Sequence, residues 1–174
     1  DIQTQASLLA AKATTKATFS GNLDARVADK TVANFLATDA STYHATTSMA
    51  VFDSQGNSRS LDLYFLKTAD NTFSVMSFLT NNATPPVSTS TTNNATTQLI
   101  TGLPFTTAGA YSAAGGNIGS KEITVIAANG VAEIKIKVDV TGMTQFGSNF
   151  AINTATQDGY SAGQLSSIEV SDVG

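Results

Sequence analysis

Three β-prone runs follow one another in the first half of the chain, with only short polar breaks between them. They occupy residues 47–52, 61–66 and 73–79. The first break, Asp53-Ser54-Gln55-Gly56-Asn57, predicts a hairpin turn because its Asp can bond nearby backbone and its Gly tolerates positive φ. The second break, residues 68–71, predicts another turn, after which apolar and polar side chains alternate. This stretch predicts a three-stranded antiparallel meander and therefore a mainly β fold.

A second hairpin is predicted around Asn129-Gly130, the dipeptide that best tolerates positive φ at both centres of a tight turn. Residues 123–127 approach this turn, and the strand that leaves it alternates without interruption. Its apolar face is formed by Ala132, Ile134, Ile136, Val138 and Val140. Its other face carries Glu133, Lys135, Lys137 and Asp139, so we expect one face to be buried and the other solvated.

The N-terminal part gives shorter signals. We expect residues 1–15 to be extended, and residues 16–23 to form a strand with a kink or bulge at Gly21-Asn22. Residues 25–41 are predicted to be a polar connector that forms either a single anchored helical turn or a packed loop.

The remaining segments are predicted mainly as loops. Residues 80–98 hold two prolines and few apolar side chains, which is typical of a long surface loop. Two glycosylation-type patterns, at Asn82 and Asn94, are expected by chance in such a Thr/Asn-rich segment. Residues 141–150 are predicted to form a glycine-punctuated turn and residues 151–163 a loop. A last short strand is expected within residues 164–170.

Composition excludes several classes of function. Charged residues make up 13% of the chain, the net charge is −4, and the nine basic residues form no cluster, so neither nucleic acid nor a membrane is an expected partner. No run approaches the roughly 20 apolar residues of a membrane span, and no cleavable signal peptide is evident. Because the chain contains no cysteine, it can form no disulfide framework, thiolate nucleophile or Cys-ligated zinc site. It does not begin with Met, so we expect it to be a piece of a longer protein.

The search for chemical sites gives no catalytic, metal-binding or cofactor-binding residue. His44 is the only histidine, and at the entry to a predicted strand it is expected to be structural. Asp53 and Gly56 resemble part of a calcium loop, but the remaining ligand positions are missing, so a turn is favoured. The Gly-rich residues 115–119 lack the strand, helix and lysine of a phosphate-binding loop. The sequence therefore predicts no enzyme and no cofactor.

Several segments, taken in order, resemble the bacterial flagellar hook protein family. In the first half these are Gly21-Asn22-Leu23-Asp24-Ala25, residues 48–57 and residues 61–68. In the second half they are Thr141-Gly142-Met143-Thr144-Gln145-Phe146-Gly147, Thr156-Gln157-Asp158-Gly159-Tyr160 and Gly163-Gln164-Leu165. The resemblance extends over residues 13–174, and residues 80–119 fit it only as a variable part. It depends on the order and spacing of the segments, because no single one is decisive.

The resemblance implies an antiparallel β-barrel or sandwich-like domain inserted into a second, discontinuous β domain. We place the inserted outer domain at residues 19–145 and parts of the middle domain at residues 1–18 and 146–174; the family's terminal assembly helices are not in this chain. It also implies a structural subunit of the extracellular hook, a universal joint between motor and filament whose outer domains make weak, sliding contacts. Expected partners are other copies in a helical tube and neighbouring flagellar axial proteins, with export that uses no cleavable signal peptide.

Three alternatives remain at this stage. An extracellular adhesin or glycan-binding module would use the loop at residues 80–98 for recognition. A related axial protein, such as a distal-rod or hook-cap subunit, would share parts of the same domain. An enzyme built around His44 is the most distant alternative. The isolated chain is expected to be monomeric, because the assembly helices of the family are missing.

Overall fold

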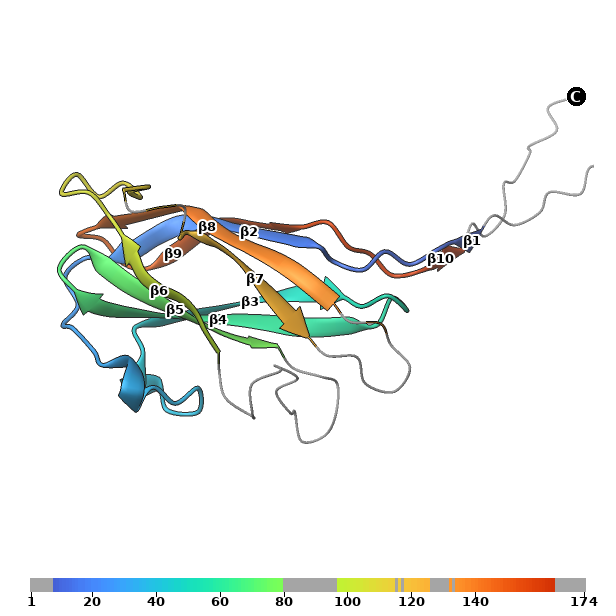
Figure 1. The fold of residues 1–174 in the computed structure, drawn as a ribbon, viewed down its shortest axis with the longest axis horizontal. Coiled ribbons are helices and arrows are strands. Elements are labelled where there is room, and N and C mark those ends of the chain that lie inside the picture. The colour runs from blue at the N-terminus through green and yellow to red at the C-terminus, as the bar shows by residue number, and fades with distance from the viewer. Residues whose placement is uncertain are drawn as a thin grey trace, which may run out of the picture.

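The computed structural model describes residues 8–79, 97–114, 116, 118–125, 132 and 134–164. Two four-stranded sheets face each other in a sandwich (Figure 1), which confirms the predicted mainly β class, in the sandwich rather than the closed-barrel form. Sheet one has the order β7 (Ser120–Val125), β8 (Ile134–Phe146), β2 (Lys16–Asp24), β9 (Ala151–Gln157). Sheet two has the order β3 (Ala45–Phe52), β4 (Ser58–Ala69), β5 (Thr72–Leu79), β6 (Thr97–Pro104).

Sheet two contains the predicted meander. Strands β3 and β4 pair without a register shift from Ala45 opposite Phe65 to Phe52 opposite Ser58. The next turn lies at Asp70-Asn71, where Asn71 has a φ of 51°, a value that Asn tolerates better than most residues. Both turn predictions are therefore confirmed, and strand β6 completes the sheet by pairing with β5.

Sheet one contains the second predicted hairpin and one pairing that was not foreseen. Strands β7 and β8 are antiparallel, and Ile134, Ile136, Val138 and Val140 are buried while Lys135 and Lys137 are exposed, as predicted. Ala132, which was predicted on the same buried face, lies before β8 and is exposed. Strand β2 lies between β8 and β9, parallel to the first and antiparallel to the second. Its pairing with β9 shifts between Ser20 and Gly21, beside the bulge predicted at Gly21-Asn22, but the extra residue is Asn153 on β9 rather than a residue of β2.

The prediction of a turn at residues 141–150 is wrong for its first half, because β8 continues to Phe146. The glycine that suggested a turn, Gly142, serves close strand pairing instead. An added Cβ at Gly142 would lie 2.9 Å from the Cβ of Ser20 on the neighbouring strand. Met143 is buried, Phe150 packs against the core from a partly buried position, and Phe146 is 50% exposed.

The prediction of a loop at residues 151–163 is also wrong in part. Residues Ala151–Gln157 form strand β9, whose residues are mostly exposed to solvent. Ile152 is its one side chain packed against the hydrophobic core, so its sequence lacks the apolar alternation by which strands are recognised.

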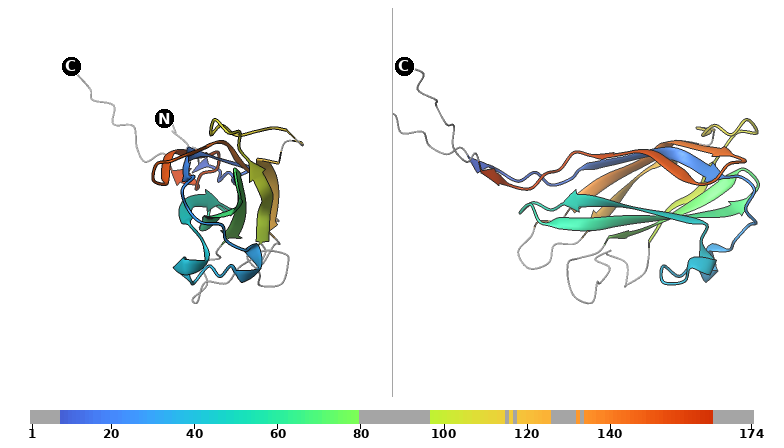
Figure 2. Two further views of the ribbon diagram at one scale, coloured as in Figure 1. Left: turned by 90° about the vertical axis from the view of Figure 1, so that its left-hand side faces the viewer. Right: turned by 180° about the vertical axis from the view of Figure 1, so that it is seen from behind.

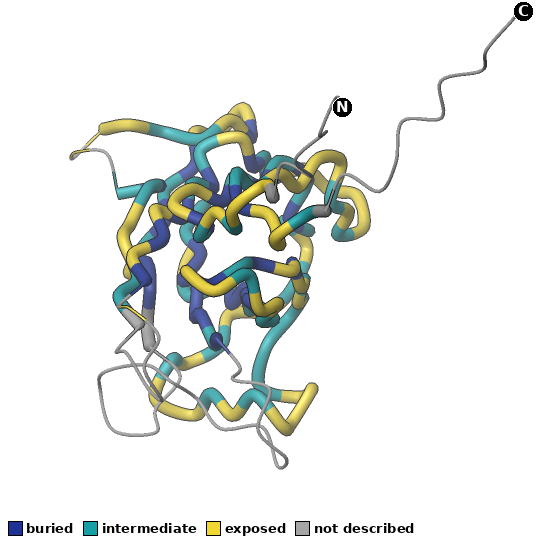
Figure 3. Tube along the Cα trace, turned by 90° about the vertical axis from the view of Figure 1, so that its right-hand side faces the viewer, coloured by how far each residue is buried: buried dark blue, intermediate teal, exposed yellow. Residues whose placement is uncertain are grey.

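The core lies between the two sheets, where the dark blue buried segments of Figure 3 gather. Sheet one contributes Phe19, Leu23, Ile134, Ile136, Val138, Val140 and Met143, and sheet two contributes Val51, Leu61, Leu63, Phe65, Phe73, Val75, Ile100 and Leu103. The aromatic side chains of Phe19, Phe65 and Phe73 thus serve as core packing, in agreement with their alternating positions in the sequence.

A narrow two-stranded ribbon extends from one end of sheet one (Figure 1; Figure 2, right). It is formed by residues 8–15 and 158–164, which continue β2 and β9 beyond the sandwich. The ribbon ends in the pairing of β1 (Leu8–Leu9) with β10 (Gly163–Gln164). The chain therefore enters and leaves the sandwich side by side, and the expected extended conformation of the N-terminal part holds for its described residues.

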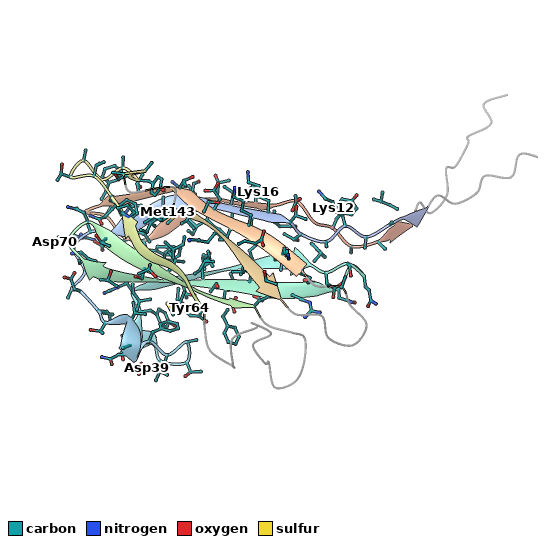
Figure 4. The ribbon with its side chains drawn as sticks, in the orientation of Figure 1. Lys12, Lys16, Asp39, Tyr64, Asp70 and Met143 are labelled. Carbon is teal, nitrogen blue, oxygen red and sulfur yellow. The ribbon has the colours of Figure 1, made fainter. Side chains whose placement is uncertain are left out.

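The connector at residues 25–43 crosses the outer face of sheet two. It contains two short 3-10 turns, Val32–Asn34 and Ala40–Thr42, where either a single helical turn or a packed loop was expected. Phe35 packs edge-on against Tyr64 of β4, with ring centroids 5.3 Å apart, and Tyr43 joins them. Figure 4 shows Tyr64 and Asp39 on this same outer side.

Some predictions fall outside the described residues. These are the Asn129-Gly130 turn, residues 80–96 of the loop predicted at 80–98 with its two glycosylation-type patterns, and residues 165–170 of the last predicted strand. The loop prediction is wrong at its end, because Thr97 and Gln98 belong to β6. The division into an inserted domain at residues 19–145 and flanking parts at 1–18 and 146–174 stays a prediction. Its first boundary falls inside β2 and its second one residue before the end of β8, in the same sheet.

Candidate functional site

His44, the residue that an enzyme would most need, occupies a structural position. Its Nδ1 accepts a hydrogen bond from the backbone N–H of Lys67 at 3.0 Å, and its own backbone N–H donates to the carbonyl of Phe65 at 2.9 Å. An Nδ1 that accepts in this way requires the neutral imidazole with its proton on Nε2. Nε2 itself is buried and has no hydrogen-bond partner among the described residues.

A cavity of about 170 Å³ adjoins this imidazole. Its lining is mainly apolar, and Asp24 and Asn149 add polar side chains to it. The lining residues are Leu23, Asp24, Val27, His44, Ala45, Phe73, Asn149 and Phe150. The Asp24 carboxylate accepts two hydrogen bonds from the Arg26 guanidinium, at 2.8 and 2.9 Å, which lower its pKa to about 2. Burial, followed by the positive charge of Lys30, lowers the pKa of His44 below its ordinary value. The prediction that no residue here is catalytic is not tested by this geometry.

The Asp53 turn is held by hydrogen bonds from its own loop. Its carboxylate accepts from the backbone N–H groups of Gln55 and Asn57, both at 2.9 Å, and from the guanidinium of Arg59 at 3.2 Å. Burial acts to raise the pKa of the fully buried Asp53, but the hydrogen bonds from Asn57, Gln55 and Arg59 outweigh it, and the pKa is lowered. Donors therefore occupy the carboxylate, as the turn interpretation requires.

The tip of this turn lies against the ribbon. Gly56 has a φ of +83°, and a Cβ added there would lie 2.8 Å from the Cβ of Ala11 and 3.1 Å from the backbone nitrogen of Ala162. Both strands of the ribbon thus contact the β3–β4 hairpin. The glycine fits this place because it tolerates positive φ and leaves room for the two neighbouring backbones.

The most organised polar cluster of the molecule lies where the ribbon joins the sandwich; we call it the ribbon junction, formed by residues 12–16 and 157–159. Oδ1 of Asp158 accepts from the backbone N–H groups of Thr15 and Lys16, at 2.8 and 2.9 Å. Oδ2 accepts from the Thr15 hydroxyl at 2.7 Å and from Nζ of Lys12 at 3.0 Å. Burial raises the pKa of Asp158, but these hydrogen bonds, led by that of Thr15, lower it well below its usual range.

Thr14 ties the ribbon junction to sheet two. Its buried hydroxyl donates to the side chain of Gln157 at 2.8 Å and accepts from the backbone N–H of Phe52 at 2.9 Å, while its own N–H donates to the Phe52 carbonyl. Gly159 is required beside it, since an added Cβ would lie 2.3 Å from the Thr14 hydroxyl oxygen. The ribbon is therefore fixed to both sheets at its base.

Sequence reasoning did not single out the ribbon junction. The signal was present, because Gln157, Asp158 and Gly159 belong to one of the segments that carry the family resemblance. Their partners lie about 140 residues earlier in the chain, and a single sequence gives no register that would place the two segments together.

Other kinds of site find no support in the described part of the chain. No group of three His, Asp or Glu side chains there could hold a metal ion. The same residues contain no helix that is long and apolar enough to cross a membrane. We therefore infer a function from the ribbon junction and from the surface of the sandwich.

Comparison of the sequence with known proteins identifies a matching family and several relatives. The family model described as the flagellar basal body protein FlaE D2 domain matches residues 22–160, which include most of the sandwich and the C-terminal side of the ribbon junction. The chain is 33% identical over 171 residues to the flagellar hook protein FlgE of Escherichia coli K12. It is 30% identical over 169 residues to the FlgE proteins of Salmonella typhimurium and Salmonella typhi.

The chain belongs to the flagellar hook protein family. This is a family of structural proteins rather than enzymes. The alignments cover 96% of this chain but only 39% of each relative, so the chain spans about two fifths of their length. Among solved structures, the 32 kDa fragment of FlgE from Caulobacter crescentus matches with a TM-score of 0.45 and 17% identity, over 66% of this chain and 46% of that one.

Proposed function

We propose that this chain is the outward-facing part of a subunit of the extracellular flagellar hook, where many copies form a curved tube that transmits torque to the filament. The observation that carries the proposal is the family match over residues 22–160. The ribbon supports it, because a sandwich that is entered and left at one end fits a module attached to a larger body.

The proposed role requires contacts between copies that break and re-form as the tube turns. The surface suits this requirement, since charged residues make up only 13% of the chain while exposed Thr, Ser and Asn side chains are frequent. Neutral polar groups on such a surface exchange hydrogen bonds with water at little net free energy. The packed core keeps the sandwich rigid while the contacts change.

The proposal also covers the other partners of the chain, its export and its division into domains. We propose that neighbouring axial proteins of the flagellum are further partners, and that the protein is exported without a cleavable signal peptide. We also propose that residues 19–145, which form most of the sandwich, are an inserted domain. Residues 1–18 and 146–174 then belong to a second β domain, and through the start of β2 and through β9 they also complete sheet one.

The test is immunogold labelling of intact flagellated cells of the source bacterium, with antibody raised against this chain. Gold confined to the short curved segment between cell surface and filament is expected. An antibody absorbed with the purified chain serves as the control. Gold over the cell body or along the filament would overturn the proposal, and gold over the cell body would favour an adhesin.

A further inference from the structure

The two sides of the sandwich differ in how their strand edges are protected. On one side β6 lies next to β7, and we call this the guarded side. Strand β6 contains Gly102 at a φ of +70°, ends at Pro104, and shifts register twice against β5. Strand β7 carries Lys121 and Glu122. Bulges, proline and charge are the features by which proteins prevent their edge strands from pairing with another chain.

The opposite side, where β3 lies next to β9, has few of these features; we call it the uncharged side. Neither strand contains a charged residue or a proline. Strand β9 has one bulge, at Asn153, whereas β3 pairs with β4 in an unbroken register over all its residues. Strand β3 is therefore the least protected edge among the described strands.

The backbone groups on the open edge of β3 can be identified from its alternation. The N–H and C=O of Phe52 both bond to Thr14, away from β4. In an antiparallel strand every second residue points its backbone groups to the same edge. Thr46, Ser48 and Ala50 therefore present theirs there too, and all three residues are exposed. At the Phe52 end this edge already accepts one backbone hydrogen bond from another segment, the N–H of Thr14, while the Phe52 N–H donates to the Thr14 hydroxyl.

The size of the uncharged side sets the strength of any contact it makes. Eight residues of β3 are about 26 Å long, and two sheets lie about 10 Å apart, so the side offers about 260 Å² per molecule. A stable complex needs about 800 Å² from each partner. Contact through this side alone would therefore not hold a dimer in dilute solution, but it can contribute to a polymer in which every subunit is held elsewhere.

We propose that the uncharged side is an interface between copies of this chain, with the free backbone edge of Thr46, Ser48 and Ala50 pairing with an edge of the next copy. The inference rests on the proposed function, which supplies the second copy. Backbone pairing suits a contact that must change, because neutral hydrogen bonds exchange with water at little net cost. It needs no charge, and its strength should hardly depend on salt.

Hydrogen exchange on the full-length protein tests the proposal. Hooks sheared from cells are compared with the same protein after depolymerisation, by mass spectrometry of the peptide that covers β3. We expect its amides to exchange at least about tenfold more slowly in the hook, because three outward N–H groups become bonded. The peptide that covers β7, on the guarded side, is the control and should change little.

Three results would be informative in different ways. A β3 peptide that exchanges equally fast in hooks and in depolymerised protein would overturn the interface while leaving the hook assignment intact. Protection of the β3 peptide in hooks on cells, without protection in hooks assembled from the purified protein alone, would indicate a partner other than a second copy of this chain. That result would also overturn the interface. Failure of the antibody to label hooks would instead overturn the proposed function.

A substitution gives a second, independent test. Ser48→Pro removes one outward N–H without removing a bond to β4, and proline is tolerated at such edge positions. Ser48→Ala keeps the N–H and is the matched control. If circular dichroism shows that both variants fold, Ser48→Pro should give fewer or shorter hooks and Ser48→Ala normal ones. Normal hooks from a folded Ser48→Pro protein would contradict the proposal; if the variant does not fold, the exchange measurement decides.

Discussion

At the scale of single residues, Asp158 does most to hold the ribbon in place, because its carboxylate accepts four hydrogen bonds from Lys12, Thr15 and Lys16. We expect Asp158→Asn to lower the free energy of unfolding by about 1–2 kcal/mol, a value reduced for partial exposure. Urea unfolding at pH 7 measures it. The control is Asp70→Asn, which changes a carboxylate that is 98% exposed and should cost almost nothing.

The contribution of Asp158 to stability should depend on pH. The pKa of Asp158 is lower in the folded protein than the ordinary value of 3.8, so the carboxylate stabilises the fold above about pH 4. This contribution is lost as the pH falls through the lowered pKa. The difference in stability between the natural chain and Asp158→Asn should therefore shrink below pH 4. An equal difference at pH 7 and pH 3 would show that the charge of Asp158 has no part in it.

His44 should make the stability depend on pH in a higher range. Its pKa is lowered in the folded protein, so the unfolded chain binds the proton more readily, and stability falls as the pH drops below about 6.5. The slope is at most about 1.4 kcal/mol per pH unit for one proton. His44→Asn keeps an acceptor for the Lys67 N–H but cannot titrate. Melting temperatures between pH 7 and pH 5 should fall for the natural chain and stay level for this variant.

At the scale of elements, the sequence predicted those strands whose signals are local. The Asp53 turn and the alternation along β8 each lie within a few residues, and all three strands of the meander were found. The continuation of β8 and the whole of β6 and β9 were missed. Gly142 resembles a turn residue but serves close packing against Ser20, and β9 has no apolar alternation because its residues are mostly exposed.

Gly21 shows how such packing constrains an element. A Cβ at this position would lie 2.1 Å from the carbonyl oxygen of Ala151, so β2 and β9 would have to separate. We expect Gly21→Ala to destabilise the chain by about 1–3 kcal/mol, the usual cost of forcing atoms into a packed site. Urea unfolding measures this change. The control is Gly147→Ala, whose Cβ would be 3.8 Å from the Arg26 side chain and should be tolerated. Equal stability of the two variants would contradict the prediction.

At the scale of the whole molecule, the predicted division at residues 18/19 and 145/146 can be measured. Strands β2 and β9 share sheet one with β8, so we expect their amides to open with the same free energy as those of β4. The amides of β1 and β10 should open more easily, since that pair lies beyond the sandwich. Native-state hydrogen exchange by NMR resolves these groups. If β9 opens separately from β8, the division at residue 145 gains support.

The isolated chain should be monomeric, because the uncharged side offers about 260 Å² where a stable complex needs about 800 Å² per partner. Light scattering at micromolar concentration should give the mass of one chain, 17.9 kDa. The value should not depend on salt, since the side carries no charge to screen. A mass that doubles with concentration would contradict this. Repeating the measurement with Ser48→Pro would then locate the contact, because a dimer through β3 should dissociate in that variant, while a dimer through another surface should persist.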